Sequence, residues 1–265
     1  MIDATPQDAL LDEAAERLYA AQATRDPLAP LSETYTDLDV ARAYSVQRRN
    51  LARHLAEGAL LRGHKIGLTS APMQTLLGVN EPDFGYVLDN MVLADGTAVP
   101  RSAFCAPRVE PEVAFLLRAP LRGPGVTIAE VMAATEAVAP ALEIVDSRIA
   151  DWRITLADTV ADNASSGAMV LGKWVPIMDA PPLPDTTAAL VVNDMLVETG
   201  QGTAVMGDPA AAVAWLANAV AGYGTAIEAG QFVMSGSYTT AVFVEVGDRA
   251  AATITGLGAV SVSFE

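Results

Sequence analysis

Acidic side chains lie inside segments of the chain that otherwise have the composition of a protein core. Glu110 and Glu112 stand two residues apart and lead into the apolar run 113–117, and Glu143 lies within the apolar stretch 140–145. If the first segment is a strand, its two carboxylates project from the same face, because side chains alternate between faces. Burying unpaired carboxylates carries a large free-energy cost, so the fold must bring positive charge to them.

A divalent cation is the compensation that this pattern favours. Mg²⁺ and Mn²⁺ prefer oxygen ligands and keep some of their waters, so three carboxylates in a core-like setting indicate a metal site. A second interpretation needs no metal: Glu110 and Glu112 would line the solvated face of an edge strand, and Glu143 would pair with an arginine. Pro111 favours such an edge strand, since proline cannot donate to a ladder.

The composition limits the possible partners. The chain has 265 residues and a formal net charge of −16, which argues against nucleic acid and against an anionic membrane surface. No uninterrupted apolar run approaches about 18 residues, so we expect no membrane span. Residues 1–5 show no feature of a secretion signal, and the single cysteine excludes a disulfide within the chain. We therefore expect a cytoplasmic protein.

One of the two lysines stands in an unusual setting. Lys65 lies in the segment 63–70, Gly-His-Lys-Ile-Gly-Leu-Thr-Ser, whose pattern predicts a strand or the end of one. A buried lysine beside a metal can transfer a proton or bind a substrate carboxylate. A lysine that extends along the surface is the alternative. Because neighbouring strand positions face opposite sides, we expect His64 to lie outside the pocket of Lys65.

Two further segments are rich in polar residues. Asp83 lies in residues 80–85, Asn-Glu-Pro-Asp-Phe-Gly, where it can act as an acid or base or can hydrogen-bond the backbone of its own turn. Residues 158–167 combine small and polar side chains in what we predict to be a loop near a ligand. Capping of a helix by Asp162 or Ser165 would explain the same segment without a ligand.

The remaining pattern predicts one α+β unit with a helical N-terminal layer. The expected helices span about 7–24, 40–57, 127–137 and 209–222. Hairpin turns are expected at 94–97 and 191–195. Strands begin at about residue 60, and those of the last fifth of the chain are expected at 232–235, 241–246, 251–255 and 260–264.

Five segments, taken in order, resemble the hydratase and decarboxylase branch of the fumarylacetoacetate hydrolase superfamily. They are residues 63–70, 77–85, 107–115, 140–152 and 158–167. The likeness runs from about residue 40 to the C-terminus. It implies a fumarylacetoacetate-hydrolase-like fold, in which a mixed β-sheet curls into a roll or barrel. We therefore divide the chain into a helical layer, residues 1–60, and a catalytic domain, residues 61–265, which together form one structural unit.

The resemblance also implies a set of site residues. The ligands of Mg²⁺ or Mn²⁺ would be Glu110, Glu112 and Glu143. The catalytic residues would be Lys65 and Asp83. The residues in contact with the substrate would be Leu68, Ser165 and Ser237.

The activity that the resemblance implies is metal-dependent hydration of a small 2-hydroxydienoic acid. The substrate would be 2-hydroxypenta-2,4-dienoate and the product 4-hydroxy-2-oxopentanoate, in meta-cleavage catabolism of aromatic compounds. A 2-oxo acid chelates a metal through its carboxylate and keto oxygens. Protonation of the dienol at C5 gives an unsaturated ketone, to which water adds at C4. Lys65 and Asp83 are the candidates for these proton transfers.

Other functions use the same parts. One alternative is decarboxylation of 4-oxalocrotonate (2-oxohex-3-enedioate), and another is hydration of 2-oxohept-3-ene-1,7-dioate. A second carboxylate needs a further anchor, for which the candidates are Arg148, Arg153 and Lys173. A different class is a non-catalytic metal-binding assembly subunit, which exposed or scattered site residues would favour. The resemblance further implies a homo-oligomer, a dimer or larger, and allows a complex with a neighbouring enzyme of the pathway.

Overall fold

The computed structural model describes residues 6–70, 74–75 and 78–265. Residues 1–5, in which we found no feature of a secretion signal, lie outside the described residues. So does residue 77, which belongs to one of the five segments of the resemblance. The helices are α1 (Pro6–Thr24), α2 (Leu31–Thr34), α3 (Val40–Ala56), α5 (Ile128–Ala134), α6 (Leu156–Ala161) and α7 (Pro209–Ala221). The strands are β1 (Leu61–Gly67), β2 (Asp83–Leu88), β3 (Val92–Ala94), β4 (Ala98–Val99), β5 (Arg108–Leu117), β6 (Thr135–Val145), β7 (Ser166–Leu171), β8 (Val175–Pro176), β9 (Thr187–Val192), β10 (Met195–Gln201), β11 (Phe232–Met234), β12 (Val242–Phe243), β13 (Arg249–Ile254) and β14 (Gly258–Phe264).

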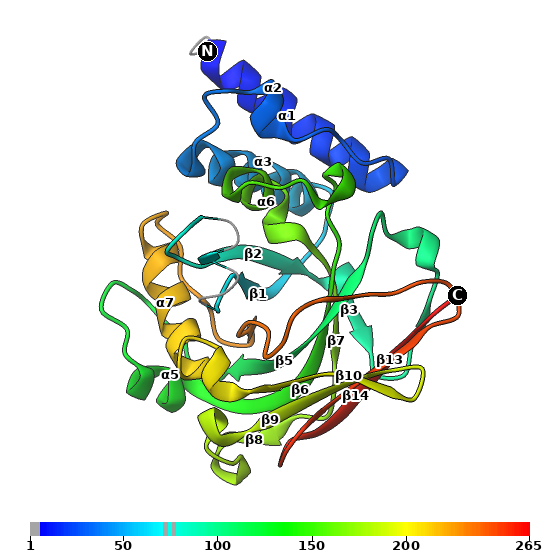
Figure 1. The fold of residues 1–265 in the computed structure, drawn as a ribbon. Helices are drawn as coiled ribbons and strands as arrows, with labels where there is room; N and C mark the ends of the chain where they lie inside the picture. Colours follow the sequence, from blue (N-terminus) through cyan, green and yellow to red (C-terminus); the bar gives the residue numbers. More distant parts are fainter. Residues whose placement is uncertain (1–5, 71–73, 76–77) are drawn as a thin grey trace.

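Two mixed sheets form the β-structure of the described residues (Figure 1). The larger has nine strands in the order β2-β1-β11-β5-β6-β7-β3, with β12 beside β5 and β8 beside β6. The smaller has five, in the order β10-β9-β13-β14-β4. Parallel pairs such as β1–β11 and β4–β14 occur among antiparallel ones. The curled, mixed sheets and the helices before them confirm the predicted α+β fold.

The N-terminal helices cover the β2–β1 end of the larger sheet together with α6, whereas α5 and α7 lie beside it (Figure 1). Leu18 of α1 and Val46 of α3 belong to the same buried core cluster as Phe84 of β2 and Val160 of α6. The helical layer therefore shares a core with the sheet, as one structural unit would require. The boundary at residues 60 and 61 stays a prediction.

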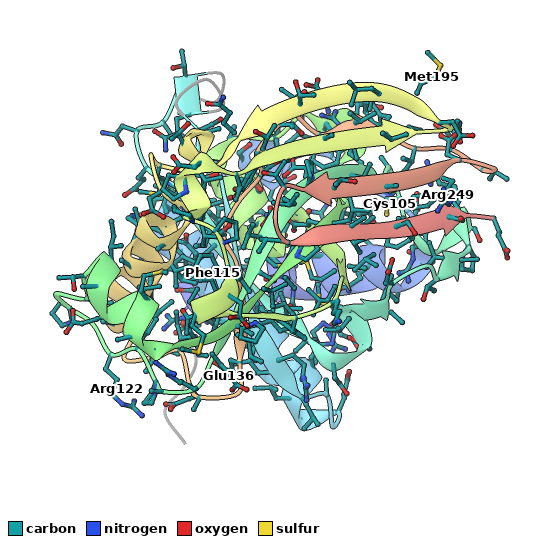
Figure 2. All side chains as sticks on the ribbon, turned by 90° about the horizontal axis from the view of Figure 1, so that it is seen from below. Cys105, Phe115, Arg122, Glu136, Met195 and Arg249 are labelled. Atoms are coloured by element: carbon teal, nitrogen blue, oxygen red, sulfur yellow. The ribbon has the colours of Figure 1, made fainter. Side chains whose placement is uncertain are left out.

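The two predicted hairpin turns have different outcomes. The turn at Asn193 and Asp194 joins the antiparallel pair β9–β10, and both residues have positive φ values, 51° and 64°, as a two-residue hairpin turn requires. Figure 2 shows Met195 just after this turn, pointing away from the sheet. The hairpin predicted at 94–97 is wrong, because β3 pairs with β7 in one sheet and β4 pairs with β14 in the other. A turn sequence reverses the chain but does not choose its partner strands.

Three predicted boundaries also shift. The helix predicted to reach residue 137 ends at Ala134, because the chain enters β6 at Thr135 and pairs there. The strand predicted over 241–246 is reduced to Val242–Phe243. The loop predicted over 158–167 includes the second half of helix α6, and that helix begins with a capping box formed by Thr155 and Asp158. In each case tertiary pairing or capping overrides a local preference.

One stretch, Gly202–Ala221, is long and apolar enough to cross a membrane by length and composition. Half of it is buried inside the protein. Val213 and Leu216 of α7 are fully buried in the main core cluster. A core helix of this composition passes the same test, so the stretch is weak evidence for a membrane span.

Asp158→Ala tests how the helical layer is joined to α6. The buried carboxylate of Asp158 accepts hydrogen bonds from the backbone N–H and hydroxyl of Ser32, at 2.9 and 2.7 Å, and from those of Thr155, at 2.9 and 2.7 Å. Its removal should lower the free energy of unfolding by about 2–4 kcal/mol in chemical denaturation. The exposed Asp185→Ala should change it by less than about 0.5 kcal/mol. Equal losses in both variants would contradict this role.

Candidate active site

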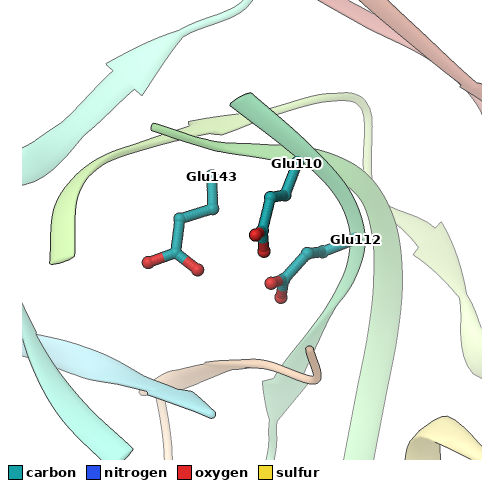
Figure 3. Close-up of side chains that lie close together, drawn as sticks. All are labelled: Glu110, Glu112 and Glu143. Carbon is teal, nitrogen blue, oxygen red and sulfur yellow. The ribbon is translucent and has the colours of Figure 1, made fainter. Parts of the chain in front are cut away.

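The three glutamates predicted as metal ligands converge inside the curl of β5 and β6 (Figure 3). Glu110 and Glu112 project from one face of β5, and Glu143 of β6 lies opposite Glu110 in the register of the two strands. One carboxylate oxygen from each residue lies within 4.8 Å of the other two. The structure therefore confirms that Glu110 and Glu112 share a face, as their i, i+2 spacing predicted. The pairing of β5 with β6 adds Glu143 as the third carboxylate.

The edge-strand interpretation of Pro111 is wrong. Strand β5 lies between β6 on one side and β11 and β12 on the other. The carbonyl of Pro111 accepts from Tyr238 N–H at 3.1 Å, so its peptide nitrogen also faces this second side, where the short strands β11 and β12 leave a gap. Because proline's missing donor points at the gap, the ladder with β6 loses no hydrogen bond.

The environment of the glutamates fits a divalent cation. Glu112 and Glu143 are fully buried, and Glu112 Oε1 and both carboxylate oxygens of Glu143 have no hydrogen-bond partner. Burial raises the pKa of all three carboxyls, and that of Glu110 reaches about 7. Gly236 N–H donates to Glu112 Oε2 at 2.9 Å and orients that side chain. Unpartnered buried oxygens in an all-oxygen donor set are what Mg²⁺ and similar hard cations require.

Lys65 supplies a fixed positive charge beside this cluster. Its Nζ lies 3.4 Å from Glu143 Oε1 and donates to the carbonyl of Ala164 at 2.7 Å. Burial lowers the pKa of Lys65, but the carboxylates of Glu143, Asp83 and the other acidic neighbours outweigh it and raise that pKa overall. With 4% of its surface exposed, Lys65 is not the surface lysine of the alternative interpretation.

Asp83 lies beside Lys65 on the neighbouring strand rather than in a turn. It begins β2 opposite Gly67 of β1. Its Oδ2 accepts from Thr159 Oγ1 at 3.4 Å, whereas its buried Oδ1 has no partner. A Cβ at Gly67 would lie 2.2 Å from Asp83 Oδ1 and 3.1 Å from Lys65 Nζ, so only glycine leaves room for both groups at this point. Burial raises the pKa of Asp83, and Lys65 opposes the shift.

A left-handed turn after α6 contains Ala164, whose carbonyl accepts the hydrogen bond from Lys65. Asn163, Ala164 and Ser165 have φ values of 55°, 51° and 51°, a conformation that costs non-glycine residues about 1–2 kcal/mol each. The side chain of Asn163 bonds both the N–H and the carbonyl of Tyr86 in β2, at 2.8 and 3.0 Å, and stabilises the turn. Asp162 lies at the end of α6 but makes no side-chain capping hydrogen bond, because its carboxylate binds Arg148 instead. The hydroxyl of Ser165 pairs with that of Thr159.

A cavity of about 260 Å³ opens beside these groups. It is lined by the predicted site residues Lys65, Leu68, Asp83, Glu110, Ser165 and Ser237. Glu112 and Glu143 are not among the residues that line it. Arg108, Trp152 and Thr159 are among the lining residues that were not predicted. The position of Arg108, two residues before Glu110, is a signal that could have placed it on the same strand face.

The residues predicted to anchor a second carboxylate do not line this cavity. Every nitrogen of the buried Arg148 guanidinium already bonds Asp162 or a carbonyl. Arg153 is exposed and pairs with Glu33 at 3.2 Å. Lys173 is exposed after β7. The prediction is wrong for all three, because sequence position carries no information on which strand ends meet.

The chain is similar in sequence to hydratases of unsaturated 2-oxo acids. It is 43% identical to the 2-hydroxyhexa-2,4-dienoate hydratase of Comamonas testosteroni, over 94% of this chain and 95% of that protein. It is 42% identical to the 2-keto-4-pentenoate hydratase of Paraburkholderia xenovorans, over 98% and 96%. Residues 46–264 match the family described as fumarylacetoacetate (FAA) hydrolase C-terminal.

The fold is similar to that of a solved decarboxylase. The 4-oxalocrotonate decarboxylase of Pseudomonas putida G7, complexed with magnesium and adipate, superposes with a TM-score of 0.95 at 33% identity and covers 99% of both chains. The fold, the carboxylate site and the sequence matches all indicate the same family. The chain belongs to the fumarylacetoacetate hydrolase family, and the resemblance seen in the sequence is confirmed.

His64→Leu tests a buried titratable group on the far face of β1. His64 does not line the cavity, as predicted, and its Nε2 has no partner. Burial lowers the pKa of His64 to about 4, against about 6.5 in an unfolded chain. Its contribution to stability is therefore complete above about pH 6.5 and is lost as the pH falls towards 4. Between pH 7.5 and pH 5, wild type should lose about 2 kcal/mol more free energy of unfolding than the variant; parallel pH curves would contradict this.

Metal addition tests the glutamate cluster. A divalent cation that binds only the folded protein should stabilise it by about 2.7 kcal/mol at 100 times its Kd, measured as a rise in Tm with Mg²⁺. Glu143→Gln should abolish this rise. Glu136→Gln is the matched control, because Glu136 lies on the same strand but is exposed (Figure 2). The same rise in Glu143→Gln as in wild type would exclude the cluster as the metal site.

Proposed function

We propose that the protein is a divalent-metal-dependent hydratase that converts 2-hydroxypenta-2,4-dienoate to 4-hydroxy-2-oxopentanoate. The observation that carries the proposal is the convergence of the carboxylates of Glu110, Glu112 and Glu143 beside a cavity that Glu110 lines together with Lys65 and Asp83. The similarity to two hydratases of such dienoates over nearly the whole chain supports the same reaction.

Glu110, Glu112 and Glu143 would hold Mg²⁺ or Mn²⁺. The bound cation supplies a Lewis acid for the carboxylate and keto oxygens of a 2-oxo acid. Magnesium accompanies the Pseudomonas decarboxylase in its crystal structure, which favours Mg²⁺ as the first metal to test. Gly236 N–H, on Glu112 Oε2, leaves Oε1 of the same carboxylate free to face the metal.

Lys65 and Asp83 would carry the proton transfers. The ammonium of Lys65 would stabilise negative charge that develops on the substrate, as a fixed cation at a reaction site does. Asp83 Oδ1, buried and unpartnered, is free to exchange a proton with a substrate carbon or with the attacking water. Both groups face the point above Gly67, so one substrate position can reach both.

Ser165, Leu68 and Ser237 would position the substrate. Ser165 Oγ lies 3.4 Å from Thr159 Oγ1, which itself bonds Asp83, so a hydroxyl pair connects the substrate wall to the proposed acid–base group. Leu68 adopts a positive φ of 57° just after β1 and lines the cavity. Ser237 also lines the cavity, in the loop that follows Gly236.

Decarboxylation of 4-oxalocrotonate is the second candidate, favoured by the similarity in fold and sequence to the Pseudomonas enzyme. An assembly subunit without activity is disfavoured, since its premise was that the glutamates and Lys65 would be exposed or scattered. The proposal includes a cytoplasmic homo-oligomer, a dimer or larger, that can associate with a neighbouring enzyme of the pathway.

The test is turnover of enzymatically generated 2-hydroxypenta-2,4-dienoate with Mg²⁺ or Mn²⁺. Absorbance of the dienol should fall and 4-hydroxy-2-oxopentanoate should form. Asp83→Asn should lower kcat by about 10²- to 10⁴-fold, because an amide cannot exchange the proton. Glu110→Ala should abolish metal-dependent turnover.

Asp185→Asn, an exposed aspartate, is the matched control and should keep wild-type turnover. Absence of turnover, or unchanged turnover in Glu110→Ala, would rule out the hydratase. Release of carbon dioxide from 2-oxohex-3-enedioate without hydration of the dienoate would favour the decarboxylase.

A further inference from the structure

A guanidinium without a partner lines the cavity. Arg108 begins β5, two residues before Glu110 and on the same face of the strand. Its Nε is buried with no hydrogen-bond partner, and across the described ranges its side chain makes no hydrogen bond or ion pair. Lys65, by contrast, is already bound to Ala164 and Glu143. Arg108 is thus a cation of this cavity whose donors are free for a ligand.

Two aromatic rings contact this guanidinium. Arg108 Cζ lies 4.3 Å from the ring centroid of Trp152 and 4.0 Å from that of Phe243. Phe243 is the partner of Arg108 in the β5–β12 register, and the indole N–H of Trp152 donates to Ala106 O at 3.0 Å, so both rings are held by the fold. A guanidinium that stacks on aromatic faces keeps the N–H groups in its plane available for hydrogen bonds.

A fixed guanidinium edge suits a carboxylate. The planar fork can donate two parallel hydrogen bonds to one carboxylate, and a pre-ordered arginine loses little entropy in doing so. A partly buried cation without a counterion is costly, so the arrangement is best explained by an anion that binds there with the ligand. Glu110, the nearest acidic side chain along β5, forms no ion pair with Arg108 in the described chain.

The distance from Arg108 to the glutamate cluster selects the length of that ligand. Two residues of strand separate Arg108 from Glu110, which is roughly 7 Å along β5. An extended six-carbon dicarboxylic acid spans roughly 6 Å between its terminal carbons by standard bond lengths. A ligand whose 2-oxo acid end lies at Glu110 can therefore place a second carboxylate at Arg108.

We propose that Arg108 binds the second carboxylate of dicarboxylic 2-oxo acids of about six carbons, so that this site accepts dicarboxylates in addition to the five-carbon dienoate. The orientation, with the 2-oxo acid end at the glutamates, rests on the proposed function. Arg108 is then a specificity-determining residue: it contacts the distal end of the ligand and leaves the reacting carbons to Lys65 and Asp83.

The experiment compares 2-oxoadipate with 2-oxohexanoate, which differ only in the terminal carboxylate. Their affinities for the Mg²⁺-treated protein are measured by calorimetry, and neither ligand has a double bond to hydrate, so the result does not depend on turnover. Wild type should bind 2-oxoadipate about 10- to 100-fold more tightly, as expected for hydrogen bonds between charged groups. Arg108→Met should abolish this preference and keep the affinity for 2-oxohexanoate.

Arg153→Met, which removes an exposed arginine, is the matched control and should keep the preference. Arg108→Lys keeps the charge without the planar fork and should keep part of it. The Mg²⁺-induced rise in Tm reports that each variant is folded with its glutamate cluster intact.

Equal affinities of wild type for the two ligands would overturn the proposal. An equal loss of affinity for both ligands in Arg108→Met would overturn it too, because it would place Arg108 at the end that the two ligands share. A protein that fails to hydrate the dienoate still yields these ratios, so the two proposals fail separately.

Discussion

The register between β5 and β6 is the constraint on which the rest of the site depends. It places Glu143 opposite Glu110, and the period of two residues along β5 adds Glu112 to the same face. A shift of one residue on either strand would turn these carboxylates to the other face of the sheet. Burying these carboxylates costs free energy in the absence of a cation, and apolar packing elsewhere must outweigh that cost. The strand pairing therefore creates a site that requires positive charge.

The surrounding structure supplies this positive charge and holds it in place through several successive contacts. Lys65 reaches Glu143 from β1, and the left-handed turn at Asn163–Ser165 holds the lysine through the carbonyl of Ala164. Helix α6 supports that turn, and Asp158 ties α6 to the helical layer through Ser32. The N-terminal helices, far from the carboxylates in sequence, therefore contribute to the rigidity of the site. Conformational strain of about 1–2 kcal/mol per residue in the turn persists because these contacts surround it.

The features that could be predicted are those with a local physical cause. Spacing placed Glu110 and Glu112 on one face, alternation separated His64 from Lys65, and the Asn193–Asp194 turn specified its own hairpin. Features that depend on a distant partner were predicted less well. Asp83 is a strand residue held by β1, Pro111 is tolerated in a central strand because its neighbours leave a gap, and Arg148 is consumed by Asp162. None of these partners is visible within the few residues on either side.

The chain's own order of residues was enough to establish the acidic cluster, the lysine beside it, the α+β class and the family, because periodicity and short motifs act over a few positions. It did not establish which cation lines the ligand cavity. Arg108, Arg148 and Arg153 look alike in sequence. They differ in what the folded chain places against each guanidinium, which is a pair of aromatic rings, a buried carboxylate or an exposed carboxylate, respectively. Those surroundings come from segments far apart along the chain, so the charges available to a ligand were decided by the pairing of strands and the packing of loops.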